Sequence, residues 1–134
     1  MKTFKLEIVT PGKLVFSGEV TSFSAPGIVG GFQVLFDHAP LLSEIGIGEV
    51  RFTDSEGNEK HYATSGGFVE VKKNHVVLLA ETAERSDEID RDRALAARAR
   101  ATERLEKKEG DLDADRARSA LQRAVNRLRL VQKG

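Results

Sequence analysis

The side chains best suited to bind an anion in this chain are arginines, and eleven of the twelve follow position 84. A guanidinium group presents a planar fork of N–H donors that matches phosphate and carboxylate oxygens. Arg123 and Arg127 are four residues apart and would share one face of a helix, as would Asp90 and Arg93, which are three apart. An antiparallel helix pair could bring Arg93, Arg123 and Arg127 together, although the same arginines could also form ordinary ion pairs with acidic side chains.

Other kinds of chemistry find little support. His38, His61 and His75 lack metal-ligand spacing, and the chain has no cysteine to join them, so no metal site is expected. The glycines at residues 46–48 and 65–67 are too few for a nucleotide-binding loop and are expected to form turns. Since no nucleophile with a partner base is recognisable, the sequence predicts neither an enzyme nor a required cofactor.

Residues 1–84 have the pattern of a sandwich of short strands. All eight aromatic residues lie before position 69, and Phe4, Leu6 and Ile8 alternate with charged residues as in a half-buried strand. Many short strands separated by turns predict an antiparallel β-sandwich or flattened barrel. After the opening strand, the expected strands are residues 14–16, 20–25, 32–36, 48–53, 60–64, 68–71 and 75–79, with a turn at Lys73-Asn74 before the last.

Residues 85–134 are expected to form two helices. Ser86 is a suitable N-cap for the first, with Asp87, Glu88 and Asp90 in its first turn, and Gly110 is a suitable C-cap. The second helix should begin at Asp111 or Asp113, and so short a link predicts an antiparallel hairpin. The apolar stripes are Ala94, Ala97, Ala101 and Leu105 in the first helix, and Ala117, Leu121, Ala124, Leu128 and Val131 in the second.

The alanines in these stripes make the expected helix contact weak. Alanine buries about one methyl group, worth roughly 0.8 kcal/mol, and leucine buries several times as much. A densely charged hairpin with such a seam is expected to dock loosely and to occupy more than one position. The alternative is a hairpin packed permanently on the sandwich, which composition alone leaves open.

The overall charge argues against nucleic acid as a partner. Residues 81–134 carry fourteen basic and twelve acidic side chains, interleaved, and no aromatic residue to stack on bases. An autonomous arginine-rich module that binds anions or nucleic acid therefore remains only as the alternative function. The longest wholly apolar run, Val76 to Ala80, is far too short to span a membrane, so a soluble protein without direct membrane insertion is expected.

Several strings along the whole chain resemble those of one family. They are Leu14-Val15-Phe16-Ser17-Gly18, His38-Ala39-Pro40-Leu41, Ser65-Gly66-Gly67-Phe68-Val69-Glu70-Val71, and Ala83-Glu84-Arg85 followed by Ile89-Asp90-Arg91-Asp92-Arg93-Ala94. In this order and at this spacing they resemble the epsilon subunits of F-type rotary ATP synthases.

The resemblance implies a non-catalytic subunit of the central stalk, peripheral to the cytoplasmic face of the cell membrane. The sandwich would pack against the gamma subunit and the ring of c subunits. The hairpin would either fold down or extend into the head of alpha and beta subunits, where it inhibits ATP hydrolysis. The partner-binding residues expected on this basis are Gly31, Phe32, His38 and Pro40. Many members carry an acid near position 31, but residues 27–32 here have no charge, so a ring contact would be apolar or through the backbone.

The string at residues 89–94 also resembles the (Ile/Leu)-Asp-x-x-Arg-Ala motif of relatives whose folded-down hairpin binds ATP. Glu84 occupies the position of a further nucleotide contact in those relatives. The resemblance therefore implies ATP as a regulatory ligand, with a binding set of Glu84, Asp90, Arg93, Arg123 and Arg127.

Overall fold

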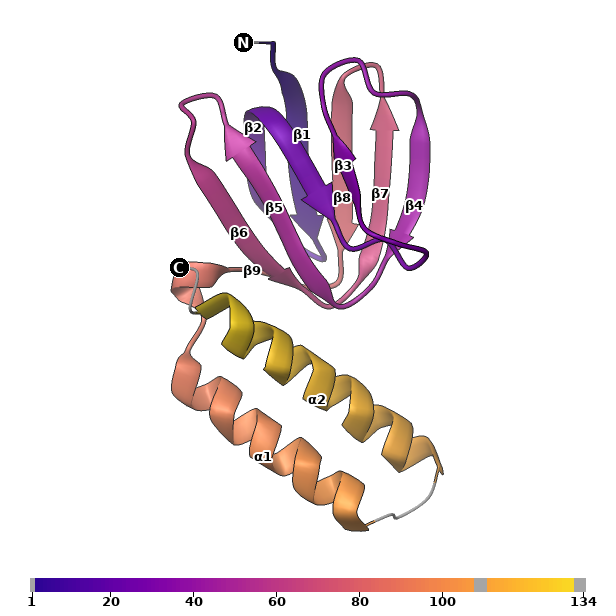
Figure 1. The fold of residues 1–134 in the computed structure, drawn as a ribbon, viewed down its shortest axis with the longest axis vertical. Helices are drawn as coiled ribbons and strands as arrows, with labels where there is room; N and C mark the ends of the chain where they lie inside the picture. Colours follow the sequence, from indigo (N-terminus) through magenta and orange to yellow (C-terminus); the bar gives the residue numbers. More distant parts are fainter. Residues whose placement is uncertain (1, 108–110, 132–134) are drawn as a thin grey trace. The chain divides into compact units, whose positions relative to one another are not determined.

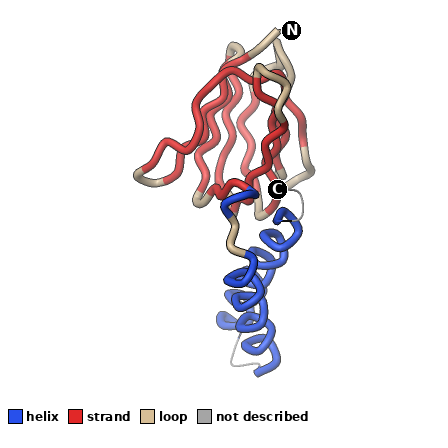
Figure 2. The backbone as a smooth tube through the Cα atoms, turned by 90° about the vertical axis from the view of Figure 1, so that its left-hand side faces the viewer, coloured by secondary structure: helices blue, strands red, loops and turns tan. Residues whose placement is uncertain are grey.

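The computed structural model describes residues 2–107 and 111–131. The chain divides into two compact units, Met1–Arg85 and Ser86–Gly134. Strands make up the first unit and helices the second, as Figures 1 and 2 show. A β-sandwich followed by a helical hairpin was the fold predicted from the sequence, and that prediction is confirmed.

The strands of the first unit belong to one curled sheet. Its order is β4-β7-β8-β1-β2-β5-β6-β9, with β3 paired to β2. β1 and β8 run parallel, and the other strand pairs that the structure describes are antiparallel. The strands are β1 (Phe4–Thr10), β2 (Lys13–Ala25), β3 (Phe32–Val34), β4 (Leu41–Ile45), β5 (Gly48–Asp54), β6 (Glu59–Thr64), β7 (Gly67–Lys72), β8 (His75–Ala80) and β9 (Ala83–Arg85).

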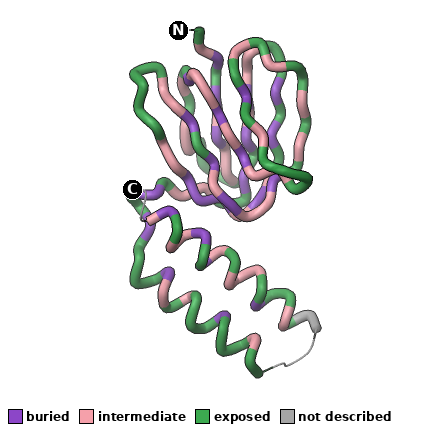
Figure 3. Tube along the Cα trace, viewed as in Figure 1, coloured by how far each residue is buried: buried purple, intermediate pink, exposed green. Residues whose placement is uncertain are grey.

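The long strand β2 turns the sheet into two layers. Its first half pairs with β1, and its second half pairs with β5 and β3. The pairing with β5 shifts between Val20 and Ser22, and a bulge of this kind bends a strand and increases its twist. The core lies between the layers, so buried and exposed residues alternate along the strands in Figure 3. Its largest fully buried side chains include Phe4, Phe23 and Phe52.

Two strands were missed by the sequence analysis, and two expected segments are one strand. β4 does not alternate apolar and polar residues in its sequence, since Leu41 and Leu42 are both apolar, although its exposure does alternate along the strand. β9 is only three residues long and includes Glu84 and Arg85. β2 is continuous through residues 17–19, where a break was expected, because its register with β1 continues there. These strands depend on their partners rather than on a pattern of their own.

The first helix begins later than expected. Ser86–Glu88 form a single 3-10 turn, η1, and α1 spans Arg91–Lys107. The expectation that Ser86 caps this helix is therefore wrong. The cap is Asp90, whose Oδ1 accepts the N–H of Arg93 at 3.1 Å and whose carbonyl accepts the N–H of Ala94 at 3.0 Å.

The second helix, α2, spans Asp111–Val131 and therefore begins at one of the two residues expected. Gly110, the expected C-cap of the first helix, lies outside the described residues. The two helices pack as an antiparallel hairpin (Figure 1).

The buried residues of the predicted helix stripes are all alanines, and α2 also buries Leu130 and Asn126, which the predicted stripe did not include. Ala94 and Ala101 of α1 and Ala117 and Ala124 of α2 are at most 2% exposed. In each helix the two alanines are seven residues apart, which is the spacing of a coiled-coil seam. The remaining residues of the predicted stripes, Ala97, Leu105, Leu121, Leu128 and Val131, are half-buried.

Candidate functional site

The alanine seam sets which residues of the two helices lie level with each other. Ala94 and Ala124 are equally far along the chain from the connection at residues 108–110. In an antiparallel pair they therefore lie at the same level. By the same register, Arg93 lies at a level between Arg123 and Arg127 of the facing helix. The three predicted arginines therefore lie at similar levels along the hairpin, with Arg93 near the start of α1 and Arg123 and Arg127 in the second half of α2.

These arginines differ in exposure. Arg93 is exposed, whereas Arg123 and Arg127 are half-buried. A half-buried arginine can pack its aliphatic stem on the helix while its guanidinium group stays near the surface. Elsewhere on α2 an arginine forms the ordinary ion pair that was the alternative interpretation, since Arg118 pairs with Asp115.

The other two predicted ATP-binding residues have roles in the chain itself. The carboxylate of Asp90 caps α1 by accepting the Arg93 N–H, and its second oxygen can still act as an acceptor. Glu84 belongs to the first unit, where it is half-buried on β9 opposite Ala63 of β6. Asp90, Arg93, Arg123 and Arg127 all belong to the second unit.

The predicted partner-binding residues lie in and beside two loops of the sandwich. Gly31 is exposed at the end of the loop before β3, and Phe32 is half-buried as the first residue of that strand. His38 is half-buried and its Nδ1 lies 2.7 Å from the carbonyl oxygen of Ala39, so this nitrogen donates. Pro40 is exposed just before β4.

The loop before β3 is fixed to the sheet by its backbone. The Ile28 N–H donates to the Glu44 carbonyl at 3.1 Å, and the Gly46 N–H donates to the Pro26 carbonyl at 2.9 Å. Its tip is apolar, since Val29 is 95% exposed and Ile28 is 59% exposed. An exposed apolar residue on an anchored loop is suited to contact with another apolar surface.

An exposed apolar surface on the sandwich was not found from the sequence. In the outer face of the layer β4-β7-β8-β1-β2, Phe68 lies opposite Leu79, Leu79 opposite Val9, and Val9 opposite Leu14. Leu42 is exposed on the same face of β4. Apolar residues at both positions of a pair such as Leu78-Leu79 were the available signal, because only one of the two points into the core. The apolar belt is defined here as Val9, Leu14, Leu42, Phe68 and Leu79.

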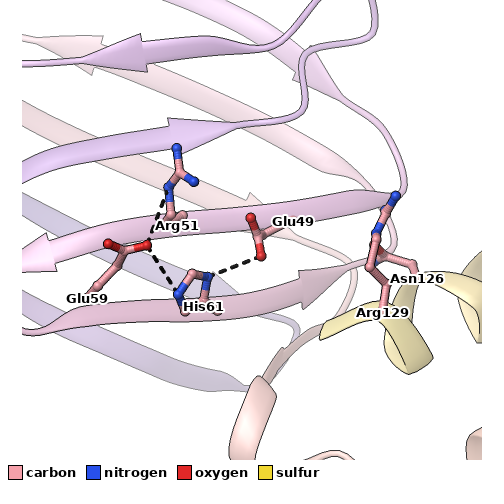
Figure 4. Close-up of polar contacts among 6 residues, drawn as sticks. All are labelled: Glu49, Arg51, Glu59, His61, Asn126 and Arg129. Carbon is pink, nitrogen blue, oxygen red and sulfur yellow. Dashed lines mark hydrogen bonds and ion pairs between the residues drawn. The ribbon is translucent and has the colours of Figure 1, made fainter. Parts of the chain in front are cut away.

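The outer face of the other layer is polar instead. On β5 and β6, the Nδ1 of His61 lies 3.1 Å from Glu49 Oε2, and its Nε2 lies 3.2 Å from Glu59 Oε1 (Figure 4). Arg51 Nε lies 3.8 Å from the same oxygen of Glu59. No group of three or more potential ligands is close enough to hold a metal ion among the residues that the structure describes. The outer face of the first layer also has polar positions, since His75 Nε2 lies 2.6 Å from Glu7 Oε1, but the apolar belt has no counterpart on β5 and β6.

Comparison with known proteins gives the family. The β-sandwich domain of the ATP synthase Delta/Epsilon chain matches residues 3–86, and the long α-helix domain of the same chain matches residues 87–132. The chain belongs to the ATP synthase delta/epsilon family. The resemblance noted from the sequence strings is thereby confirmed.

Several bacterial relatives of this ATP synthase family are about half identical to the chain. The ATP synthase epsilon chain of Desulforamulus reducens is 48% identical over 80% of both chains. That of Pelotomaculum thermopropionicum is 50% identical over 80% of this chain and 79% of its own.

Single chains in two solved ATP synthase structures share the fold of this chain at lower sequence identity. A chain in the OSCP/F1/c-ring structure of the Euglena gracilis mitochondrial ATP synthase has a TM-score of 0.81 at 19% identity, covering 90% of this chain and 76% of that one. A chain in the central stalk and c-ring of the Tetrahymena thermophila mitochondrial ATP synthase has a TM-score of 0.57 at 17% identity, covering 98% and 96%. Within the described residues, neither helix of this ATP synthase family member is long and apolar enough to cross a membrane.

Proposed function

We propose that this chain is the non-catalytic epsilon subunit of an F-type ATP synthase, and that it links the gamma subunit to the c ring in the central stalk. The observation that carries the proposal is the match of both domains over residues 3–132, together with epsilon chains that are 48% and 50% identical. In this role the protein is peripheral to the cytoplasmic face of the cell membrane and depends on its partners for that position.

The apolar belt is the surface that we assign to the gamma subunit. Its four large residues, Leu14, Leu42, Phe68 and Leu79, are each more than half exposed. Contiguous exposed apolar side chains commonly mark a protein interface, because burying them on a partner removes them from water. His38 and Pro40 lie in the loop that leads into β4 and its Leu42, so they extend this surface.

The loop before β3 is the element that we assign to the c ring. Gly31 and Phe32 end this loop, and its uncharged tip exposes Ile28 and Val29. A contact made by such a tip would be apolar and would change little with salt, since no ion pair is screened.

The hairpin is the regulatory part of the proposed function. Its alanine seam buries little area, so opening or moving the hairpin costs a few kcal/mol and a partner or ligand could shift it. Extended, the hairpin would reach the alpha and beta subunits and inhibit ATP hydrolysis. Folded, it would bind ATP through Asp90, Arg93, Arg123 and Arg127, with Glu84 as the further contact.

The similar levels of Arg93, Arg123 and Arg127 along the hairpin support ATP as the ligand of its folded state. The chain has no glycine-rich phosphate loop, so side-chain guanidinium groups must hold the phosphate oxygens. The seam places Arg93 at a level between Arg123 and Arg127, so one ligand bridging these side chains would tie the two helices together. ATP would then favour the folded hairpin and relieve inhibition as its concentration rises.

Co-purification tests the subunit assignment. The tagged full-length chain should isolate gamma, alpha and beta subunits, and deletion of residues 87–134 should leave assembly intact while ATP hydrolysis increases. Absence of these subunits would refute the assignment. Unchanged hydrolysis by a complex that contains the shortened chain would refute the inhibitory role of the hairpin.

Calorimetric titration with ATP tests the ligand. Arg123→Ala and Arg127→Ala should each weaken binding by ten- to a hundredfold, which corresponds to about 1.5–3 kcal/mol for a charge-assisted contact. Arg118→Ala is the matched control, because this arginine of the same helix pairs with Asp115 and should not affect ATP. Equal losses in all three variants, or no binding at millimolar ATP, would contradict the assignment.

A further inference from the structure

The loop between β3 and β4 crosses from one layer of the sandwich to the other. Residues 35–40, called here the crossover loop, leave β3, which pairs with β2 and so lies in the layer of β5. They enter β4, which pairs with β7 in the other layer. Figure 1 shows this loop beside the β7–β8 turn at the end of the sandwich where the N-terminus lies. The crossover loop includes His38 and Pro40, and its Leu35 is 52% exposed.

Two side chains, distant in sequence, lock the crossover loop to that turn. The backbone N–H of Asp37 donates to Asn74 Oδ1 at 2.7 Å, and Asn74 Nδ2 donates back to Asp37 Oδ1 at 2.9 Å. Asp37 has a φ of 61°, an uncommon conformation for a residue with a side chain. The reciprocal pair, called here the Asp37–Asn74 clamp, therefore holds the loop in a shape that it would otherwise seldom adopt.

Asn74 is itself held from two further directions. Lys73 and Asn74 form the two-residue turn between β7 and β8, with φ of 51° and 59°. The Asn74 carbonyl accepts the N–H of Lys5 at 3.0 Å, which ties the turn to the start of β1. The clamp thus fixes the crossover loop to a junction of three strands rather than to another loop.

The clamp is poorly placed to stabilise the fold as a whole. Asp37 is exposed and Asn74 is half-buried, and a hydrogen bond so near the surface contributes little because water competes for the same atoms. β3 and β4 are already anchored to their own partners at either end of the loop. The clamp acts instead on the conformation of residues 35–40, the six residues between β3 and β4.

We propose that Asp37 and Asn74 are positioning residues that hold the crossover loop in the shape recognised by the gamma subunit. This rests on the proposed function, in which the loop continues into Leu42 of the apolar belt. A loop that is ordered before binding loses less conformational freedom when it binds, and affinity rises accordingly. The clamp therefore acts on affinity for gamma without touching gamma itself.

Asn74→Gly is the sharpest test, because glycine accepts the positive φ of the turn and removes only the clamping side chain. The full-length variant should bind isolated gamma subunit about tenfold more weakly than the unaltered chain, with little change in thermal unfolding. The amide of Asp37 should exchange faster with solvent. Asp37→Asn keeps the same acceptor and should bind gamma normally.

Two further variants separate positioning from general stability. Asn74→Asp alone places two carboxylates together and should weaken binding, and the exchange Asp37→Asn with Asn74→Asp should restore it. The matched control is Asp54→Ala, since Asp54 fixes the β5–β6 turn by accepting the N–H groups of Glu56 and Asn58, both at 2.9 Å. That variant should lower stability without weakening gamma binding.

The two proposals fail in different ways. If the unaltered chain does not bind gamma, the proposed function is refuted and the clamp proposal falls with it. If the unaltered chain binds but Asn74→Gly binds equally well, only the clamp proposal is overturned. Failure of the double exchange to restore binding would also overturn it.

Discussion

Replacing Asp90 by alanine and by serine separates its role as the cap of α1 from its proposed contact with ATP. Both substitutions remove the carboxylate, but the serine hydroxyl can still accept the Arg93 N–H that Asp90 Oδ1 accepts at 3.1 Å. Alanine cannot. The two variants should therefore differ in the stability of the start of α1. If the carboxylate contacts ATP, they should lower the affinity for ATP equally.

The magnitudes follow from the geometry of this helix end. Loss of an N-cap side chain costs about 1 kcal/mol, and loss of a carboxylate near the positive end of the helix dipole costs roughly 0.3–1 kcal/mol at low salt. Asp90→Ala should then destabilise the start of α1 by about 1–2 kcal/mol. Asp90→Ser should lose only the charge contribution, which salt will screen because Asp90 is exposed.

Amide hydrogen exchange measures the first effect, and calorimetry with ATP measures the second. In Asp90→Ala, exchange in the first turns of α1 should accelerate about 5- to 30-fold, as expected for about 1–2 kcal/mol. At high salt, Asp90→Ser should match the unaltered chain. Equal acceleration in both variants at high salt would refute the capping role. Normal ATP affinity in Asp90→Ser would show that the carboxylate contributes to ATP binding only through the helix.

Three more substitutions test the packing and the turns. Gly67→Ala should lower the free energy of unfolding by about 2–5 kcal/mol in a urea titration, because φ is 148° and an added Cβ would collide with a carbonyl of β8; a stable variant would contradict this geometry. Ala117→Leu should overpack the seam, lower the free energy of unfolding by about 1–3 kcal/mol, and lengthen the distance between spin labels on the two helices. Ala99→Leu, at an exposed position of α1, should do neither. The backbone N–H of Asn58 is the largest cause that holds the pKa of Asp54 below its ordinary value, so the β5–β6 turn should be fully stabilised above about pH 4 and weaken as pH falls through the lowered pKa. An NMR titration of the Asp54 carboxyl carbon with a midpoint at or above the ordinary value would refute this.

The sequence predicted those parts of the fold whose signal is local. Phe4, Leu6 and Ile8 alternate within one strand, and the alanine seam repeats within each helix, so neither depends on distant residues for its recognition. β4 and β9 were missed because their pairing with β7 and β6 supplies what their own patterns lack. The start of α1 was misplaced because Ser86 and Asp90 are both good caps, and sequence alone does not rank them.

The candidate sites likewise were predictable from the sequence only where their signal is local. The spacing of Arg123 and Arg127 put them on one helix face, and the hairpin register with Arg93 followed from the short connection. The apolar belt was missed because the wholly apolar run at residues 76–80 does not show that Leu79 faces outward, and the other members of the belt lie on different strands. The Asp37–Asn74 clamp joins residues 37 positions apart, and no periodicity connects them.

The parallel pairing of β1 with β8 constrains when the sheet can form during synthesis of the chain. Lys5 pairs with His75, so β1 has no partner on one edge until β8 follows it from the ribosome. Contacts this distant in sequence form slowly, whereas the hairpin needs only local ones. Until then β1 exposes an open edge that other chains could extend. A nascent chain that has emerged from the ribosome only as far as residue 74 would therefore be a substrate for chaperones, whereas one that has emerged through Ala80 would expose every strand of the β4-β7-β8-β1-β2 layer for pairing.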